Sequence, residues 1–180
     1  ADDGSWSYIF PFDFPFYGVS YRTIYVSSNG LITFLGPDAD AVRSVAALGR
    51  KLAVAPAWYD WETFDPFDIY IWESGNYVGI RWQAQAVGSG VVGNFEAVLS
   101  SEGVIQFNYE HFDGPLGAIV GISNGVGHVI AEQIANPSYA STVVFLPFAG
   151  TRDVAVLSVD PSMHDVPAGN PVDVSVVVEN

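Results

Sequence analysis

Short segments that alternate apolar and polar residues follow one another along most of the chain. This period of two is the pattern of half-buried β-strands. In the segment VIQFNYE, for example, Ile105, Phe107 and Tyr109 alternate with polar side chains. Turn signals such as Asn29-Gly30 separate the segments, as expected between paired antiparallel strands. The pattern therefore predicts an all-β fold, an antiparallel β-sandwich of the jelly-roll or immunoglobulin-like kind.

Departures from this strand pattern indicate how the chain is organised. Residues 38–51 form one weakly helical stretch. Composition divides the chain into a β-sandwich domain over residues 1–150 and a two-strand extension over residues 151–180. The extension holds strand patterns at residues 153–159 and 171–180. An isolated pair of strands is marginal in water, so these strands are expected to pair with something else.

The charge balance excludes several classes of partner. Six Lys and Arg residues stand against twenty Asp and Glu residues, which gives a formal net charge of −14. Such a surface repels nucleic acid and anionic membranes, and it attracts cations such as calcium. The chain has no cysteine, and no apolar run reaches the roughly 18 residues of a membrane-spanning helix. The start, ADDGSW, lacks an initiator Met, as in a secreted chain after signal-peptide removal or in a trimmed one.

Four pieces of the chain carry a family resemblance when they are taken in order. They are an aromatic-Gly entry leading to a Ser-Asn-Gly turn, an APxWxD-like segment, a hairpin and a last strand. Their sequences are FPFYGVSYRTIYVSSNGLITF (14–34), LAVAPAWYDWET (52–63), NFEAVLSSEGVIQFNYEHF (94–112) and GAIVGISNG (117–125). Together they resemble the nidogen-like (NIDO) extracellular β domain, although a small Ala57 precedes Trp58 where the family pattern has a larger apolar residue.

The tail, residues 153–180, is similar to the first two strands of CARDB, an immunoglobulin-like domain of prokaryotic surface and adhesion proteins. The two resemblances together imply an extracellular or cell-surface protein in adhesion or assembly. Neither family is associated with a general catalytic site, so we do not expect an enzyme. No His-x-x-x-His spacing and no Gly-x-Ser-x-Gly motif occurs, which agrees with that expectation.

One acidic run is a candidate calcium site. It places four carboxylates within nine residues: Asp60, Glu62, Asp65 and Asp68. Calcium takes six to eight oxygen ligands, commonly from a loop with closely spaced carboxylates, but this spacing fits no EF-hand. The alternative is that Asp60 caps a turn and the other three are solvated loop charges.

Aromatic side chains suggest a second kind of site. Trp58, Trp61, Trp72 and Trp82 could together form a platform on which sugar rings stack, although tryptophans in a sandwich of this size more often fill the core. Trp82 shares a face with Val78 and Ile80 and is therefore expected in the core. Trp61, beside the acidic run, is the best candidate for an exposed aromatic.

Valines on one face make the tail a candidate donor strand. The proposed subunit-interface residues are Val154, Val156, Leu157, Val159, Val172, Val174, Val176 and Val178. The tail could begin a longer domain, fold back on its own sandwich, or add a strand to a neighbouring copy. The leading hypothesis is a pilus-like surface filament built by donor-strand complementation, with other copies of the same chain as partners. The alternative is an adhesin or glycan-binding module from a larger surface protein, with surface glycans as partners.

Overall fold

We describe the fold from a computed structural model of the chain, which covers residues 1–114, 116–134 and 142–146. Two predictions from the sequence concern residues outside these ranges. They are the two-strand extension over residues 151–180 and its apolar residues, Val154, Val156, Leu157, Val159, Val172, Val174, Val176 and Val178. The proposed donor strand therefore stays a prediction, and the structure describes only the surfaces that could accept such a strand.

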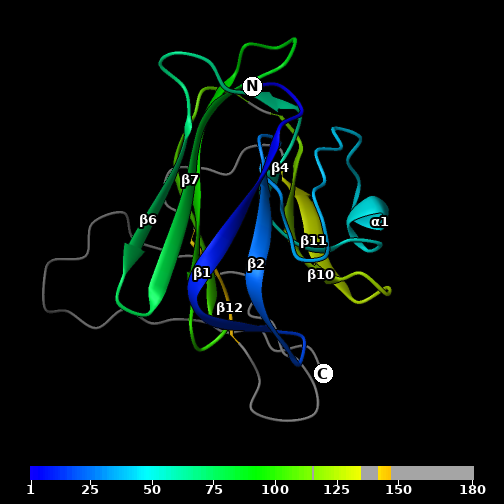
Figure 1. Cartoon of the computed structure of the whole chain (residues 1–180). Coiled ribbons are helices and arrows are strands. Elements are labelled where there is room, and N and C mark those ends of the chain that lie inside the picture. The colour runs from blue at the N-terminus through cyan, green and yellow to red at the C-terminus, as the bar shows by residue number, and fades with distance from the viewer. Residues whose placement is uncertain (115, 135–141, 147–180) are drawn as a thin grey trace, which may run out of the picture.

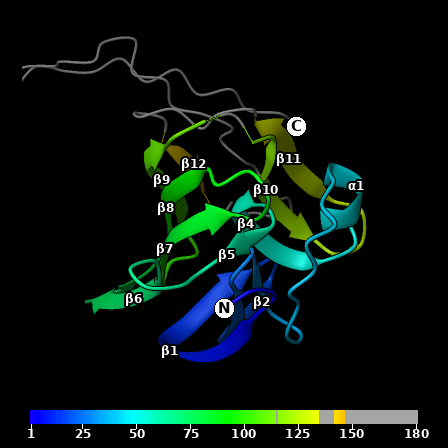
Figure 2. The ribbon, with the colours of Figure 1, turned by 90° about the horizontal axis from the view of Figure 1, so that it is seen from above.

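Two six-stranded antiparallel sheets make up the body of the molecule (Figure 1). The first sheet contains, in spatial order, β1 (Ser5–Phe16), β2 (Val19–Ser27), β3 (Ile32–Thr33), β4 (Leu52–Trp58), β10 (Ala118–Asn124) and β11 (Val129–Ile134). The second contains β12 (Val143–Phe145), β9 (Ile105–Phe112), β8 (Val92–Ser100), β7 (Tyr77–Ala86) and β5 (Trp61–Glu62), and β6 (Ile69–Ser74) also pairs with β7. Seen from above, the sheets face each other (Figure 2), which confirms the predicted antiparallel β-sandwich.

Apolar side chains at alternate positions of the strands fill the space between the sheets, as the sequence predicts. Ile105, Phe107 and Tyr109 of β9 are all buried, and Trp82 of β7 is fully buried. Trp82 stands opposite Phe95 of β8, and their rings stack with centroids 5.3 Å apart. Such aromatic pairs in register hold neighbouring strands together and exclude slippage by one residue, which would turn every core side chain to solvent.

In the part of the chain that the structure describes, one short helix, α1 (Val45–Leu48), covers the outer side of the first sheet (Figure 1). It is much shorter than the weakly helical stretch expected at residues 38–51. Ser44 caps it, with its hydroxyl oxygen accepting from Ala47 N at 3.0 Å. Under the helix lies a second small core, formed by Leu31, Leu48, Ala53, Ala55, Trp58 and Ile119. β4 is therefore covered on both of its faces.

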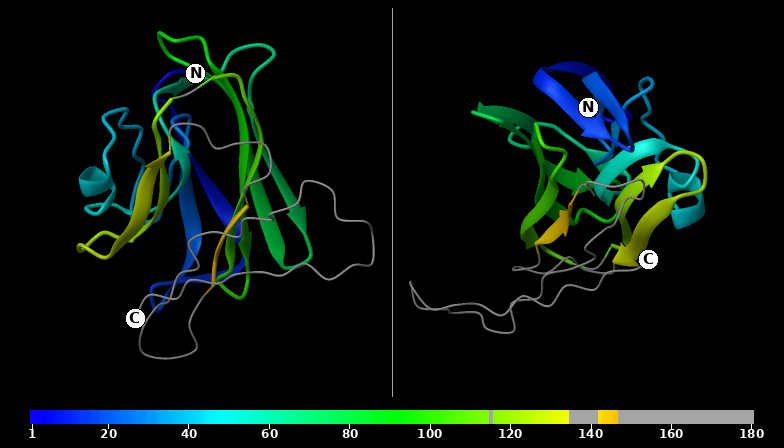
Figure 3. Two further views of the ribbon diagram at one scale, coloured as in Figure 1. Left: turned by 180° about the vertical axis from the view of Figure 1, so that it is seen from behind. Right: turned by 90° about the horizontal axis from the view of Figure 1, so that it is seen from below.

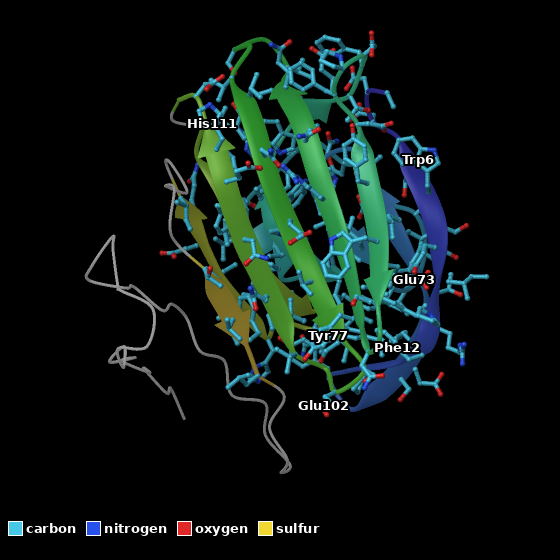
Figure 4. All side chains as sticks on the ribbon, turned by 90° about the vertical axis from the view of Figure 1, so that its left-hand side faces the viewer. Trp6, Phe12, Glu73, Tyr77, Glu102 and His111 are labelled. Carbon is cyan, nitrogen blue, oxygen red and sulfur yellow. The ribbon has the colours of Figure 1, made fainter. Side chains whose placement is uncertain are left out.

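Each sheet ends in strands that pair on one side only within the described residues. In the first sheet these are β1 and β11. In the second they are β12 at one end and β5 and β6, which both pair with β7, at the other; β5 also has an isolated bridge to Asp2. Figure 3 shows β11 and β12 on the same side of the sandwich, and Figure 4 shows β1 running beside β6 on the other. Edge strands matter because their free N–H and C=O groups can pair with another chain.

Candidate functional site

The Ser-Asn-Gly turn after β2 is a buried junction that positions the surrounding loops. Asn29 is fully buried. Its amide nitrogen donates to Asp3 Oδ1 at 2.8 Å and to Ala39 O at 2.9 Å, and its amide oxygen accepts from Trp61 N at 2.9 Å. One side chain thus ties the N-terminal segment, the loop before α1 and β5 to the same point.

The junction brings together an acidic cluster that we define as Asp2, Asp3 and Asp60. Their carboxylate oxygens lie within 4.8 Å of one another, the only such group of three potential metal ligands in the part of the chain that the structure describes. Burial raises the pKa of the Asp60 carboxyl, and the charges of Asp2 and Asp3 raise it further, while Arg43 opposes them. The cluster therefore holds more negative charge than its surroundings neutralise.

The structure does not gather the four acidic residues that the sequence suggested as calcium ligands. Asp60 joins Asp2 and Asp3, and Glu62 forms an isolated β-bridge with Asp2. Asp65 and Asp68 are exposed in the segment before β6. Asp68 accepts from Ile69 N at 2.8 Å, an ordinary contact of a loop carboxylate. Calcium binding stays a prediction, and its best described location is the acidic cluster.

A groove of about 490 Å³ separates the edges of β1 and β6. It is lined by Ala1, Trp6, Ser7, Tyr8, Val26, Thr63, Phe64, Asp65, Phe67, Asp68, Ile69 and Ile71. The Tyr8 hydroxyl donates to Glu73 Oε1 at 2.6 Å, which links the two strands. Burial and the neighbouring Glu73 carboxylate raise the pKa of the Tyr8 phenol, so this donor stays protonated. Trp6 and Glu73 mark the two strands in Figure 4.

The expectation that Trp61 is exposed is wrong. Trp61 is fully buried, and its indole N–H donates to Ala57 O at 2.8 Å. Its ring reaches over β8 at Gly93, where a Cβ would lie 2.5 Å from the ring. Trp58 is also fully buried. Among the four tryptophans considered for a sugar platform, Trp72 is the exposed one, at 39%.

Trp72 lies on the outer face of the second sheet, next to a shallow depression of about 350 Å³. The depression is lined by Arg81, Asn94, Phe95, Glu96, Asn108, Tyr109 and Glu110. The sequence analysis named Trp72 among four candidates for a platform but preferred Trp61 as the exposed one, although the sequence contains a signal that favours Trp72. Trp72 and Gly79 are equally distant from the Gly75-Asn76 turn, so a hairpin pairs them, and a large aromatic often covers a glycine in a neighbouring strand.

A comparison with protein-family models decides the family. The model described as NIDO related matches residues 1–151. The chain belongs to the NIDO-related family. NIDO-related domains are generally extracellular, and membership of this family therefore indicates an extracellular β domain. The resemblance seen in the sequence is thereby confirmed for the sandwich.

Two further comparisons identify no individual relative of the chain. Searches of curated proteins and of solved structures found no match. The tail beyond residue 151 lies outside the family match, and its similarity to CARDB is not confirmed. Within the described residues of this NIDO-related chain, no helix is long and apolar enough to cross a membrane.

Proposed function

We propose that this NIDO-related domain is a structural subunit of an extracellular filament. In this proposal residues 171–180 of one copy add a strand in the groove between β1 and β6 of the next copy. The groove is the observation that supports it, because two free strand edges and apolar side chains meet there. Adding a strand would let an incoming main chain pair with a free edge, while its alternate side chains enter the groove.

Apolar exposure at both edges favours such a partner. Trp6 of β1 is 48% exposed and Ile71 of β6 is 41% exposed, and both line the groove. Natural proteins usually protect an edge strand with charges, proline or a bulge, because a long apolar edge promotes pairing with other chains. β1 has prolines and a register shift only toward its second half, between Ile9 and Phe14. Its first half, beside β6, lacks that protection.

The tail has the chemistry of an occupant. Val172, Val174, Val176 and Val178 recur at every second position, so a strand would present them on one face. Burying one valine stabilises by roughly 1.5 kcal/mol, so four contribute about 6 kcal/mol before the entropy of ordering and association is subtracted. That gain, together with main-chain hydrogen bonds, is the source of affinity in strand addition.

The donor segment and the acceptor groove belong to different parts of the chain. Residues 171–180 follow β12 in the sequence, and β12 and β6 are at opposite ends of the second sheet (Figure 2). Donor and acceptor would then be different surfaces of each subunit. A contact between unlike surfaces propagates into a filament unless it closes into a ring.

The test uses two full-length variants, one that blocks the donor strand and one that blocks the acceptor groove. Val174→Asp puts a charge on the donor face, and Ile71→Asp puts one in the groove. Each variant alone should stay monomeric by light scattering and electron microscopy, whereas the wild type polymerises. An equimolar mixture should form dimers and stop there, because it contains one intact donor and one intact acceptor.

Matched controls carry the same charge elsewhere. Ser175→Asp lies on the opposite face of the donor segment, and Val126→Asp lies in the β10–β11 loop, where the side chain is 86% exposed. Both should polymerise like the wild type. A wild type that stays monomeric at every concentration would overturn the proposal. So would a mixture without dimers, and if Val174→Asp then also lowered the melting temperature, the tail would belong to its own sandwich.

A further inference from the structure

We propose that the outer face of the second sheet binds a neutral oligosaccharide, with Trp72 as the stacking surface. This inference is independent of filament assembly, because it uses a sheet face and not a sheet edge. It starts from an exposed aromatic ring that the fold holds flat, and it rests on the polar side chains of the neighbouring strands.

The indole of Trp72 lies flat across β7. A Cβ placed on Gly79 would lie 2.1 Å from Trp72 Cε2 and 2.2 Å from Nε1, so the ring rests directly on the glycine backbone. The indole N–H donates to Glu96 Oε1 of β8 at 2.6 Å, which fixes the ring's orientation in its plane. One face of the ring is therefore covered by the sheet, and the other accounts for its 39% exposure.

Polar side chains beside the ring are held in a hydrogen-bonded array. Asn108 donates to Glu96 Oε2 at 2.9 Å, and Gln106 donates to Asn108 Oδ1 at 2.6 Å. On the other side of the depression, Arg81 Nε donates to Asn94 Oδ1 at 2.8 Å, and Arg81 also pairs with Glu110. These amide, carboxylate and guanidinium groups retain further donor and acceptor capacity, so they can bind hydroxyl groups without first reorganising.

The arrangement matches the chemistry of a sugar ring. A pyranose has a C–H face that packs on an aromatic ring, and its hydroxyl groups hydrogen-bond with amides and carboxylates in the plane around it. Trp72 and the Arg81–Glu96 pair occupy successive positions on the outer face, about 7 Å apart along the strands. A chain of linked sugars could therefore stack on Trp72 and continue into the depression.

Charge decides between ligands that stack on aromatic rings. A nucleic acid also stacks on exposed aromatics, but it is a polyanion and the chain carries a net charge of −14. Within the depression two carboxylates, Glu96 and Glu110, face one guanidinium, that of Arg81. Anionic sugars, such as sialylated or sulfated ones, are disfavoured for the same reason. The site is suited to an uncharged oligosaccharide.

The experiment applies full-length protein to an array of neutral oligosaccharides, made of glucan, mannan, xylan, chitin and galactan fragments, beside a sialylated and sulfated set. The strongest neutral binder is then titrated by calorimetry. Trp72→Ala should lower the affinity by about tenfold or more because the stacking surface is lost, and Trp72→Tyr should retain part of it. Leu35→Ala, which removes an exposed apolar side chain that lines neither the groove nor the depression, should bind like the wild type.

The comparison is repeated in the Val174→Asp background, so that binding is measured whether or not the protein assembles. Circular dichroism and the melting temperature verify that each variant is folded, and Asn108→Ala gives a second, milder change within the site. An array with no neutral binder would overturn the proposal. Binding only to the anionic set, or equal losses for Leu35→Ala and Trp72→Ala, would overturn it as well.

Discussion

Asn29→Ala is the substitution that best tests how the fold holds its loops together. The change leaves Trp61 N–H, which is buried, without its acceptor, and it removes the donor that serves Asp3 and Ala39. An unsatisfied buried group costs about 1–3 kcal/mol, and each of the more accessible bonds contributes about 0.5–1.5 kcal/mol. The expected loss in the free energy of unfolding is therefore about 4 kcal/mol, the middle of a range of about 2–6 kcal/mol.

Urea denaturation at a protein concentration below that of assembly measures this loss directly. For a chain of this size, about 4 kcal/mol corresponds to a fall of roughly 8–16 °C in melting temperature. Asn76→Ala is the matched control, because Asn76 is exposed in the β6–β7 turn and its side chain has no such role. The control should change stability by less than about 0.5 kcal/mol.

Asn29→Asp separates the two halves of the junction. The new carboxylate keeps an oxygen for Trp61 N–H, but it faces the Asp3 carboxylate where the amide had donated. The Asn29→Asp variant should therefore be destabilised more at neutral pH than in acid, where protonation of a carboxylate relieves the repulsion. If Asn29→Ala unfolds with the same midpoint as Asn76→Ala, the junction does not hold the loops and the reasoning fails.

Two further changes test the acidic cluster and the stacking surface. Gly79→Ala should displace the Trp72 ring, cost about 1–3 kcal/mol of stability and increase quenching of tryptophan fluorescence by acrylamide, whereas Gly36→Ala, where the added Cβ meets nothing within 4 Å, should do neither. The raised pKa of Asp60 means that, between 3.8 and its folded value, the folded state binds more protons than the unfolded state, so stability falls as pH rises through that window. Asp60→Asn should therefore raise the melting temperature at neutral pH, with a gain that disappears below pH 3.8, and a constant gain across a pH series would contradict this account. The same pair of proteins checks the calcium hypothesis, because added Ca²⁺ should raise the melting temperature of the wild type and leave that of Asp60→Asn unchanged.

Local patterning was enough to predict the sandwich. The alternation of Phe107 and Tyr109 with polar residues, and the glycine turns between segments, depend only on near neighbours in the chain, and they specify antiparallel strands with a buried face. The same reasoning placed Trp82 in the core. Pairing between distant segments could not be predicted in this way, because no local period in the sequence encodes it.

The acidic cluster and Trp61 show where local reasoning ends. Asp2 meets Glu62 through a bridge across some sixty residues of chain, so the spacing of Asp60, Glu62, Asp65 and Asp68 within their own run does not decide which carboxylates gather. Trp61 sits among charged residues in the sequence, yet β5 pairs with β7 and Gly93 leaves room for its ring in the core. In both cases a non-local contact overrides the neighbourhood in the sequence.

The two proposals place their sites on opposite sides of one strand. In β6, Ile71 pairs in register with the core residue Ile80 and faces the groove, whereas Trp72 pairs with Gly79 and faces outward. A strand added at the edge of β6 would therefore leave the stacking surface open. A single shallow sugar site of this kind binds weakly by itself, but a filament would repeat it at regular intervals, and linked sites can exceed the affinity of one by about 100- to 10,000-fold. Assembly would then strengthen glycan binding, because strand addition at the β6 edge repeats the subunit and each subunit presents one Trp72 site on its outer face.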